Sequence, residues 1–190
     1  MTIEDISIGL IEHGSHQGKP AVIITCGKKQ ELDLNEIIET IRAANLGMVF
    51  IEGNPSEYPQ EIRDIIRAVS NLNTHIVLCC DASEAIENYR RIRTLTFCIK
   101  NKSADGVSGF RRETFGLLKP ADNLVIAFNN VDTAEAEFDI ALKFLMSRTV
   151  AKPLICLEMS REIKDKKPEL FTKFLTVSSK FAFPTKISII

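Results

Sequence analysis

The chain has 190 residues, of which 45% are hydrophobic and 26% are charged, and its formal net charge is −1. This composition is ordinary for one globular domain, and a charge near zero offers no field that would attract nucleic acid or an anionic membrane. No run approaches the roughly 20 apolar residues of a membrane span, no secretory signal opens the chain, and the five cysteines lie within apolar runs, as reduced thiols do. We therefore expect a single cytoplasmic domain over residues 1–190, with no nucleic-acid or membrane partner.

In the first half of the chain, short β-rich runs alternate with amphipathic helical patterns. The run PAVIITC at 20–26 is typical of a strand that is buried on both faces. Residues 34–44 place isoleucines at helical spacing, and Asp33 with the following Glu36 forms an N-terminal capping pattern. Further strands are predicted over 48–51, 75–80 and 95–99, and further helices over 61–72 and 83–92.

The second half repeats this alternation. Strands are predicted over 123–128, 153–157 and 185–190. Helices are predicted to end near Phe115, to run from Asp132 to about residue 147, and to start at Pro168, a helix position where proline is tolerated. The polar segments between these elements are predicted to be a turn at 14–19, a loop at 101–109 and an exposed, mobile loop at 160–167.

The alternation of strands and helices predicts an α/β fold, in which repeated βα units form a parallel sheet with right-handed crossovers. Two architectures fit this pattern, a partial TIM-like (βα)6 barrel and an open doubly wound sheet, and we favour the partial barrel. In both, the functional site lies at the carboxyl-terminal ends of the strands. Functional residues are therefore expected in the loops that follow the predicted strands.

Three of these strand ends carry polar or conformationally special residues. Gly53, Asn54 and Pro55 follow the second predicted strand, where glycine and proline form a tight turn that can present backbone groups to a ligand. Asp81 and Lys100 end the third and fourth predicted strands, and such a charge pair at the end of a parallel sheet suits a small polar ligand. The plainer alternative makes Asp81 a helix N-cap and Lys100 a solvated lysine.

The cysteines also fall near the carboxyl-terminal ends of predicted strands. If their thiolates converged, they would suit zinc or iron, whereas small buried cysteines simply suit parallel strands. We favour the second interpretation and predict no metal site, because neighbouring side chains of a strand point to opposite faces. The residues concerned are Cys26, Cys79, Cys80, Cys98 and Cys156.

Together these loops resemble radical SAM proteins of the activating-enzyme type, the group that includes pyruvate formate-lyase activating enzyme. The likeness is strongest at IEGNPSEYP, where Gly53, Pro55 and Pro59 match that family's G-G-E-P turn and the proline that follows it. Weaker matches are LCCDAS at 78–83 and FCIK at 97–100, which retains Lys100. The resemblance implies a barrel with a [4Fe–4S] cluster whose open iron binds S-adenosylmethionine (SAM).

The chain departs from this family at the residues on which its chemistry depends. The cluster motif C-x3-C-x2-C is reduced to Cys26, since Gln30 and Asp33 stand at the matching positions and neither is a usual iron–sulfur ligand. Asn54 replaces the acid of the G-G-E-P turn, and Cys79 replaces the usual aspartate of the third strand. We therefore expect a degenerate member, a pseudoenzyme with no iron–sulfur cluster and no predicted cofactor, with SAM binding left open.

Such a protein would act by binding a small ligand or a protein partner at the carboxyl-terminal ends of the strands. Its ligand contacts are expected at Gly53, Asn54, Pro55, Asp81 and Lys100. Whether the chain is an enzyme stays open, but the missing cysteines argue against radical SAM activity.

Two other classes of function also fit the strand ends. One is an α/β enzyme of unknown reaction that uses Cys26, Asp81, Lys100 and Asn129. The other is a nucleotide-binding doubly wound domain, for which CGKK at 26–29 is the candidate phosphate loop before the first helix. The turn GSHQGK does not qualify as a phosphate loop, because a proline and a strand follow it in place of Ser/Thr and a helix.

Overall fold

The structure of the chain is a computed structural model. It describes residues 2–31, 33–92, 94–100, 111–128, 130–146, 153–182 and 184–189. The predicted α/β class is confirmed: over the described residues, eight strands follow one another in the sheet in chain order. The chain divides into two compact units, which we call the N-terminal unit (1–80 and 84–98) and the C-terminal unit (81–83 and 99–190).

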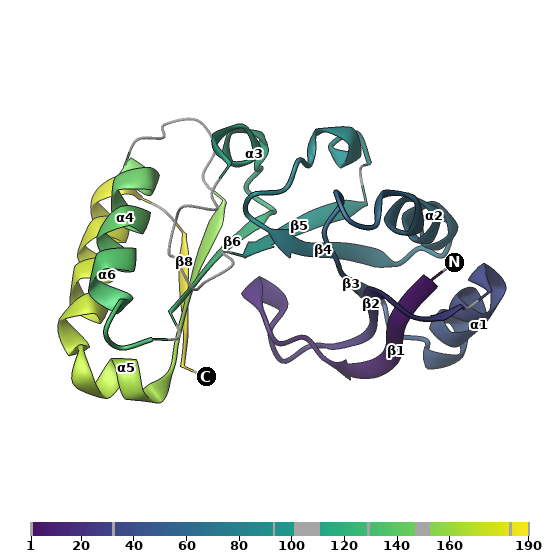
Figure 1. Cartoon of the computed structure of the whole chain (residues 1–190), viewed down its shortest axis with the longest axis horizontal. Helices are drawn as coiled ribbons and strands as arrows, with labels where there is room; N and C mark the ends of the chain where they lie inside the picture. Colours follow the sequence, from purple (N-terminus) through teal and green to yellow (C-terminus); the bar gives the residue numbers. More distant parts are fainter. Residues whose placement is uncertain are drawn as a thin grey trace. The chain divides into compact units, whose positions relative to one another are not determined.

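The described part of the first hundred residues alternates strands with helices, as predicted (Figure 1). The strands are β1 (Thr2–Leu10), β2 (Pro20–Glu31), β3 (Met48–Glu52), β4 (His75–Asp81) and β5 (Leu95–Lys100). The helices are α1 (Leu34–Ala44) and α2 (Pro59–Val69), and the short 3-10 turns are η1 (Gly14–His16) and η2 (Glu87–Tyr89). Strand β2 pairs in parallel with β3, and β3 pairs in parallel with β4.

The N-terminal unit opens with an antiparallel hairpin of β1 and β2, closed by the turn that was predicted at 14–19. Strand β1 was not predicted, although Ile6, Ile8 and Leu10 alternate with smaller residues at the period of a strand. Two of these side chains, Ile8 and Leu10, stay more than half exposed. Strand β1 thus lacks the nearly continuous apolar character by which the buried strands were recognised.

The hairpin is irregular where β2 passes its predicted end at residue 26. The register of the pair shifts around Ile3, and a Cβ at Gly27 would lie 2.5 Å from the Cβ of Glu4. Only glycine fits this close approach of the two strands. Beyond this irregular stretch β2 pairs with β1 again at Gln30 and Glu31, which lengthens it beyond the predicted strand.

Helices α1 and α2 form for the reasons that the sequence suggested. Asp33 and Glu36 make the reciprocal hydrogen bonds of a capping box at the start of α1, as predicted. Helix α1 ends at Asn45, whose backbone is left-handed (φ 49°). Proline occupies the first turn of α2, where no intrahelical N–H is required. The inward faces of the two helices are made of the buried side chains Ile37, Ile41, Ile62, Ile65, Ile66 and Val69.

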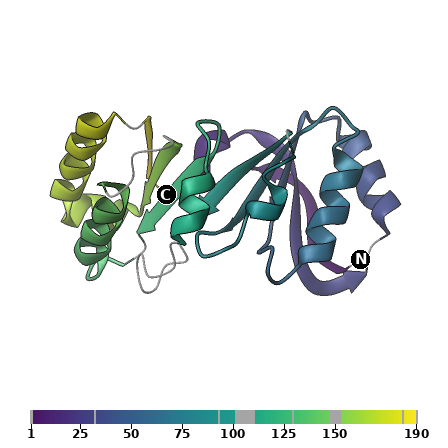
Figure 2. The ribbon, with the colours of Figure 1, turned by 90° about the horizontal axis from the view of Figure 1, so that it is seen from above.

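The C-terminal unit repeats the βα pattern, and its last three helices are grouped on one side of its strands (Figures 1 and 2). Its elements are α3 (Arg112–Leu117), β6 (Asn123–Phe128), α4 (Ala134–Met146), β7 (Leu154–Met159), α5 (Arg161–Lys166), α6 (Pro168–Phe181) and β8 (Thr185–Ile189). Strands β6, β7 and β8 pair in parallel in that order. Phe128 of β6 contacts Phe138 of α4, which in turn contacts Phe174 of α6, with ring centroids 5.8 and 6.3 Å apart. These rings form the core between the strands and the helices.

Two predictions of local structure were wrong. The segment 83–92 is not a helix but contains only the turn η2, because its side chains are held by contacts outside the segment. The segment 160–167, predicted to be a mobile loop, contains helix α5. The Ser160 side chain caps this helix, buried Ile163 anchors it, and Lys166 pairs with Glu162 one turn earlier. The predicted loop at 101–109 lies outside the described residues.

Among the helices that the structure describes, none combines the length and the apolar character needed to cross a membrane.

Candidate functional site

The register of the parallel strands fixes which side chains share a face of the sheet in the N-terminal unit. Thr25 on β2 lies opposite Glu52 on β3, and Glu52 lies opposite Cys79 on β4. Because alternate residues of a strand point to opposite faces, these three side chains form one row on one face. We call Thr25, Glu52 and Cys79 the Glu52 row. It stands at the carboxyl-terminal end of β3, close to where the sequence predicted a site.

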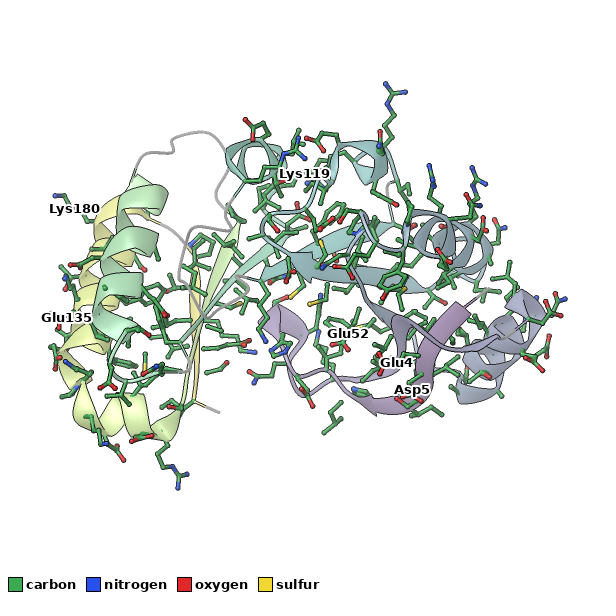
Figure 3. The ribbon with its side chains drawn as sticks, viewed as in Figure 1. Glu4, Asp5, Glu52, Lys119, Glu135 and Lys180 are labelled. Carbon is green, nitrogen blue, oxygen red and sulfur yellow. The ribbon has the colours of Figure 1, made fainter. Side chains whose placement is uncertain are left out.

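The Glu52 row combines a hydroxyl, a carboxylate and a thiol. Thr25 Oγ1 donates a hydrogen bond to Glu52 Oε2 at 3.3 Å, the one polar contact that this carboxylate makes within the described part of the chain. Glu52 is partly exposed, whereas Cys79 is buried. Figure 3 shows Glu52 on the side of the strands away from α2. The carboxylate is therefore placed to accept hydrogen bonds from a ligand on the face opposite the helices.

A second thiol continues the row on β5. The Ile76 N–H donates to the Thr94 carbonyl at 3.3 Å, and this bond sets the parallel register so that Cys98 lies beside Cys79. Both are free, buried cysteines. The sequence placed both cysteines at strand ends, and the register brings this pair side by side. Among the described residues, however, no group of three histidine, cysteine or acidic side chains is arranged to hold a metal ion.

Cys26 lies on the opposite face of the sheet, against the helices. A Cβ at Gly53 would be 2.8 Å from the Cys26 Cβ, 3.1 Å from its Sγ and 3.7 Å from Ile62 Cδ1 of α2. The side chain of Cys26 therefore fills the space between the strand ends and α2, and it points away from the Glu52 row. Because neighbouring residues of a strand point to opposite faces, Cys26, the cysteine of the cluster motif, lies on the other face of the sheet from the Glu52 row.

The environment of Cys26 suppresses thiolate formation. Burial, and to a smaller extent the charge of Glu61, raises the pKa of the Cys26 thiol from 9.0 to about 12. Burial also raises the pKa of Cys156 to about 12, with nearby Lys186 opposing and Glu158 reinforcing the shift. The thiolate is the form that attacks electrophiles and binds metals. Cys26 is therefore suited to packing and not to nucleophilic catalysis, which argues against its role in the α/β enzyme alternative.

We expect Cys26 in the folded protein to resist alkylation by iodoacetamide at pH 8. A thiol with a pKa of about 12 is roughly 1 part in 10⁴ thiolate at that pH, against about one tenth for a pKa of 9.0, so labelling should be slowed about 1000-fold. The measurement is peptide mass spectrometry of Cys26 during labelling in buffer and in urea. Between pH 7 and 9.5 the native rate should rise about tenfold per pH unit. Rapid labelling of the native protein would contradict this placement.

The turn Gly53–Asn54–Pro55 is closed by its own hydrogen bonds. Gly53 N–H donates to the Cys79 carbonyl at 3.0 Å, and the Asn54 carbonyl accepts the N–H groups of Glu57 and Tyr58, both at 3.0 Å. The Asn54 side-chain amide donates to Glu57 Oε1 at 3.2 Å. The sequence predicted backbone groups presented to a ligand, but the groups described here are used within the protein.

Glu84 holds this turn in place and was not predicted as a site residue. One carboxylate oxygen accepts the Ser56 N–H at 2.9 Å, and the other accepts the Ser56 hydroxyl at 2.7 Å. Glu84 is buried and Ser56 is exposed, so these bonds are partly shielded from water. No local pattern signals the contact, because the two residues are 28 positions apart in the chain. We call Glu84 and Ser56 the turn clamp.

Asp81 and Lys100 are neighbours, as their positions at the ends of predicted strands implied. The Ala82 N–H donates to the Lys100 carbonyl at 2.8 Å, which continues the β4–β5 ladder and puts the two residues side by side. Both are partly buried. They belong to the C-terminal unit, whereas the Glu52 row belongs to the N-terminal unit. Asn129, the remaining candidate, lies outside the described residues.

The positions that match the cluster motif do not fit an iron–sulfur cluster. Gln30 pairs with Ile3 near the open end of the β1–β2 hairpin. The Asp33 carboxylate accepts from the N–H and side chain of Asn35 at the start of α1, at 3.4 and 3.0 Å. Cys26 packs on the helix side of the sheet, Gln30 belongs to a strand and Asp33 caps a helix, so the three positions do not come together as cluster ligands.

The candidate phosphate loop at 26–29 is part of a strand. It lies inside β2, not in a loop that opens a helix. Its N–H groups therefore do not form the helix N-terminus that a phosphate needs.

Comparison of the chain with models of protein families, with curated proteins and with solved structures gives no significant match.

Proposed function

We propose that this protein is a radical SAM-like pseudoenzyme that binds a small polar ligand at the Glu52 row. The observation that carries the proposal is the half-buried Glu52 carboxylate, which has one long hydrogen bond, from Thr25, among the described residues and stands at the strand ends. A carboxylate that is partly withdrawn from water favours a positively charged or N–H-bearing group. The ligand class that fits best is a small cation.

Strand order supports the barrel-like arrangement that the resemblance implies. In a doubly wound sheet the order of the strands reverses at a switch point, so the strands do not follow one another in chain order. Here the strands follow chain order from β1 to β8. We therefore retain a partial TIM-like (βα)6 barrel as the proposed architecture.

The residues at the three positions that match the cluster motif support a function in binding and not in radical chemistry. A [4Fe–4S] cluster requires three thiolates, but of the matching positions one is a packed thiol, one a strand residue and one a helix cap. SAM stays a candidate ligand because it is itself a cation, and the proposal derives no reaction from it.

Differential scanning fluorimetry with a panel of cations tests the proposal. The panel contains SAM, methionine methyl ester, putrescine and spermidine, with S-adenosylhomocysteine as the analogue that lacks the sulfonium charge. We expect at least one cation at 100 times its Kd to stabilise the protein by about 2.7 kcal/mol, or roughly 5–10 °C in Tm. The Glu52→Gln variant should lose this response, because the amide keeps the shape of the side chain but removes its charge.

The outcomes separate the two parts of the proposal. A panel without effect on the wild-type Tm, or an equal shift in Glu52→Gln, would refute ligand binding at the Glu52 row. Iron and acid-labile sulfide measured after anaerobic reconstitution test the pseudoenzyme part. A stoichiometric cluster whose absorption changes with SAM would overturn it.

A further inference from the structure

We propose that two copies of this chain associate through their first strands, with β1 of one copy pairing antiparallel with β1 of the other. Strand β1 stands at one end of the strand order, and among the described residues its one strand partner is β2. The sheet would then continue from one copy into the other. This surface is separate from the Glu52 row.

The outer edge of β1 presents backbone groups that a second strand can bind. At the turn end of the hairpin, the Ile11 N–H donates to the Lys19 carbonyl at 3.0 Å. Because hydrogen-bonded and non-hydrogen-bonded pairs alternate in an antiparallel ladder, every second residue back from Ile11 bonds to β2. Ile6, Ile8 and Leu10 therefore direct their N–H and C=O groups away from β2, toward the free edge.

The same residues carry an exposed apolar row. Ile8 is 63% exposed and Leu10 is 61% exposed, the two highest values among the large hydrophobic side chains that the structure describes. Ile6 lies on the same face of the strand and is half-buried. A strand of another chain would remove this row from water and would also satisfy the backbone groups of the edge.

The two edge strands of the sheet differ in their protection against such pairing. Proteins that stay monomeric keep an edge strand short or give it lysine, proline or a bulge. Strand β8, at the other end, has five residues, contains Lys186 and follows an exposed proline, Pro184. Strand β1 has nine residues without lysine or proline, and its pairing with β2 is regular from Asp5 to Leu10. Strand β1 is thus the edge that is open to a partner strand.

The charges on β1 favour a second copy in the antiparallel direction. Glu4 and Asp5 are exposed near the start of the strand (Figure 3). A parallel, in-register pair would put each acid against the same acid of the other copy, which is destabilising. In an antiparallel pair with Ser7 opposite Ser7, Asp5 lies opposite Gly9. Glu4 then lies opposite Leu10, so no like charges face each other.

This register also matches the apolar row to itself. Ile6 of each copy lies opposite Ile8 of the other copy, which gives two apolar cross-strand pairs. The two-fold axis passes beside Ser7, and an isologous contact of this kind is complete with two copies. The expected assembly is therefore a dimer and not a fibre.

Sedimentation velocity at protein concentrations from about 5 to about 200 μM tests the association. One strand pair is a small interface, so we expect a reversible dimer whose fraction rises with concentration. Ile8→Lys puts a charge into the strand pair and should raise the Kd of the dimer at least tenfold. Ile189→Lys on β8 and Leu175→Lys on α6 are matched controls, because each residue is 43% exposed and lies outside β1. Both should leave the Kd unchanged.

Cysteine cross-linking tests the register. The two Ser7 residues would form a non-hydrogen-bonded pair with Cα atoms about 4.5 Å apart, which is close enough for a disulfide. Ser7→Cys should therefore give a covalent dimer on a non-reducing gel after mild oxidation, since the five native cysteines are buried. Asp5→Cys should not, because the two copies of residue 5 would stand four residues apart along the strands, roughly 13 Å.

Several outcomes would overturn the proposal. They are a wild-type protein that stays monomeric over this concentration range, an unchanged Kd in Ile8→Lys, and the absence of a Ser7→Cys cross-link or an equal one in Asp5→Cys. Loss of the dimer in Ile189→Lys would also overturn it, because the contact would then belong to β8.

Discussion

Replacing Glu84 with alanine is expected to lower the free energy of unfolding by about 3 kcal/mol, because the change removes two hydrogen bonds to a charged acceptor. The Ser56 N–H and hydroxyl donate to this one carboxylate at 2.9 and 2.7 Å. The Glu84 carboxylate is buried, so in the alanine variant the Ser56 groups lose a charged acceptor that is partly shielded from water. Without these two bonds, the turn between β3 and α2 should become less ordered. Equilibrium unfolding in urea, followed by circular dichroism, gives the difference.

Two milder variants of the turn clamp make the prediction sharper. Ser56→Ala keeps the backbone bond and loses the hydroxyl bond, so it should cost about 1 kcal/mol. Glu84→Gln keeps one acceptor and should fall between the two. The double variant Ser56→Ala with Glu84→Ala should cost less than the sum of the single changes, because both remove the same hydroxyl bond. If Glu84→Ala proves no less stable than the wild-type protein, Glu84 does not hold the turn.

The βα pattern of this chain was predictable because its signals are local. The apolar run in β2, the isoleucine spacing of α1 and its capping box each lie within a dozen consecutive residues. Strand β1 was missed because its apolar residues, such as Ile8, stay exposed at the first strand of the sheet. Helix α5 was missed because its sequence is mostly charged. The burial of Ile163 that anchors it depends on tertiary packing, which the local sequence does not show.

The candidate site was only partly predictable, because strand ends are visible in a sequence but strand faces depend on register. Asp81 and Lys100, which the sequence placed at strand ends, lie side by side. Cys26 and Glu52 are both strand-end residues, yet they point to opposite faces. One residue of register decides whether a side chain packs under α2 or lies on the polar face. The turn clamp carried no sequence signal, since the two residues meet only through the fold.

Gly53 shows how a motif residue can have a structural reason that differs from the one its sequence suggests. Glycine in a turn usually serves a left-handed backbone, but Gly53 is not among the described residues with positive φ. Its side chain is excluded because Cys26 occupies the space, with Cβ 2.8 Å from the position that a Cβ of residue 53 would take. The glycine of the IEGNPSEYP match is thus required for packing between β2 and the turn.

The Gly53→Ala variant is therefore expected to lose about 2–3 kcal/mol of stability through overpacking. The contact involves backbone-linked atoms on both sides, so neither can rotate away. Gly47→Ala is the matched control, because a Cβ there meets nothing within 4 Å and its φ is not positive. It should be neutral or raise stability by up to about 1 kcal/mol, since alanine restricts the unfolded chain. Urea unfolding of the three proteins is the measurement.

A double-mutant cycle tests whether contact with Cys26 causes the destabilisation expected for Gly53→Ala. Cys26→Gly removes both atoms that a Cβ at residue 53 would meet closest, and alone it should destabilise through the cavity that it leaves. In the Gly53→Ala background the new methyl group fills part of that cavity, so the double variant should be more stable than additivity predicts by about 1–2 kcal/mol. Strict additivity would mean that Gly53 is needed for something other than the Cys26 contact. A favourable coupling would show that the glycine of the turn and the cysteine at the cluster position pack directly against each other, so that Gly53 serves the fit of Cys26 and not a ligand.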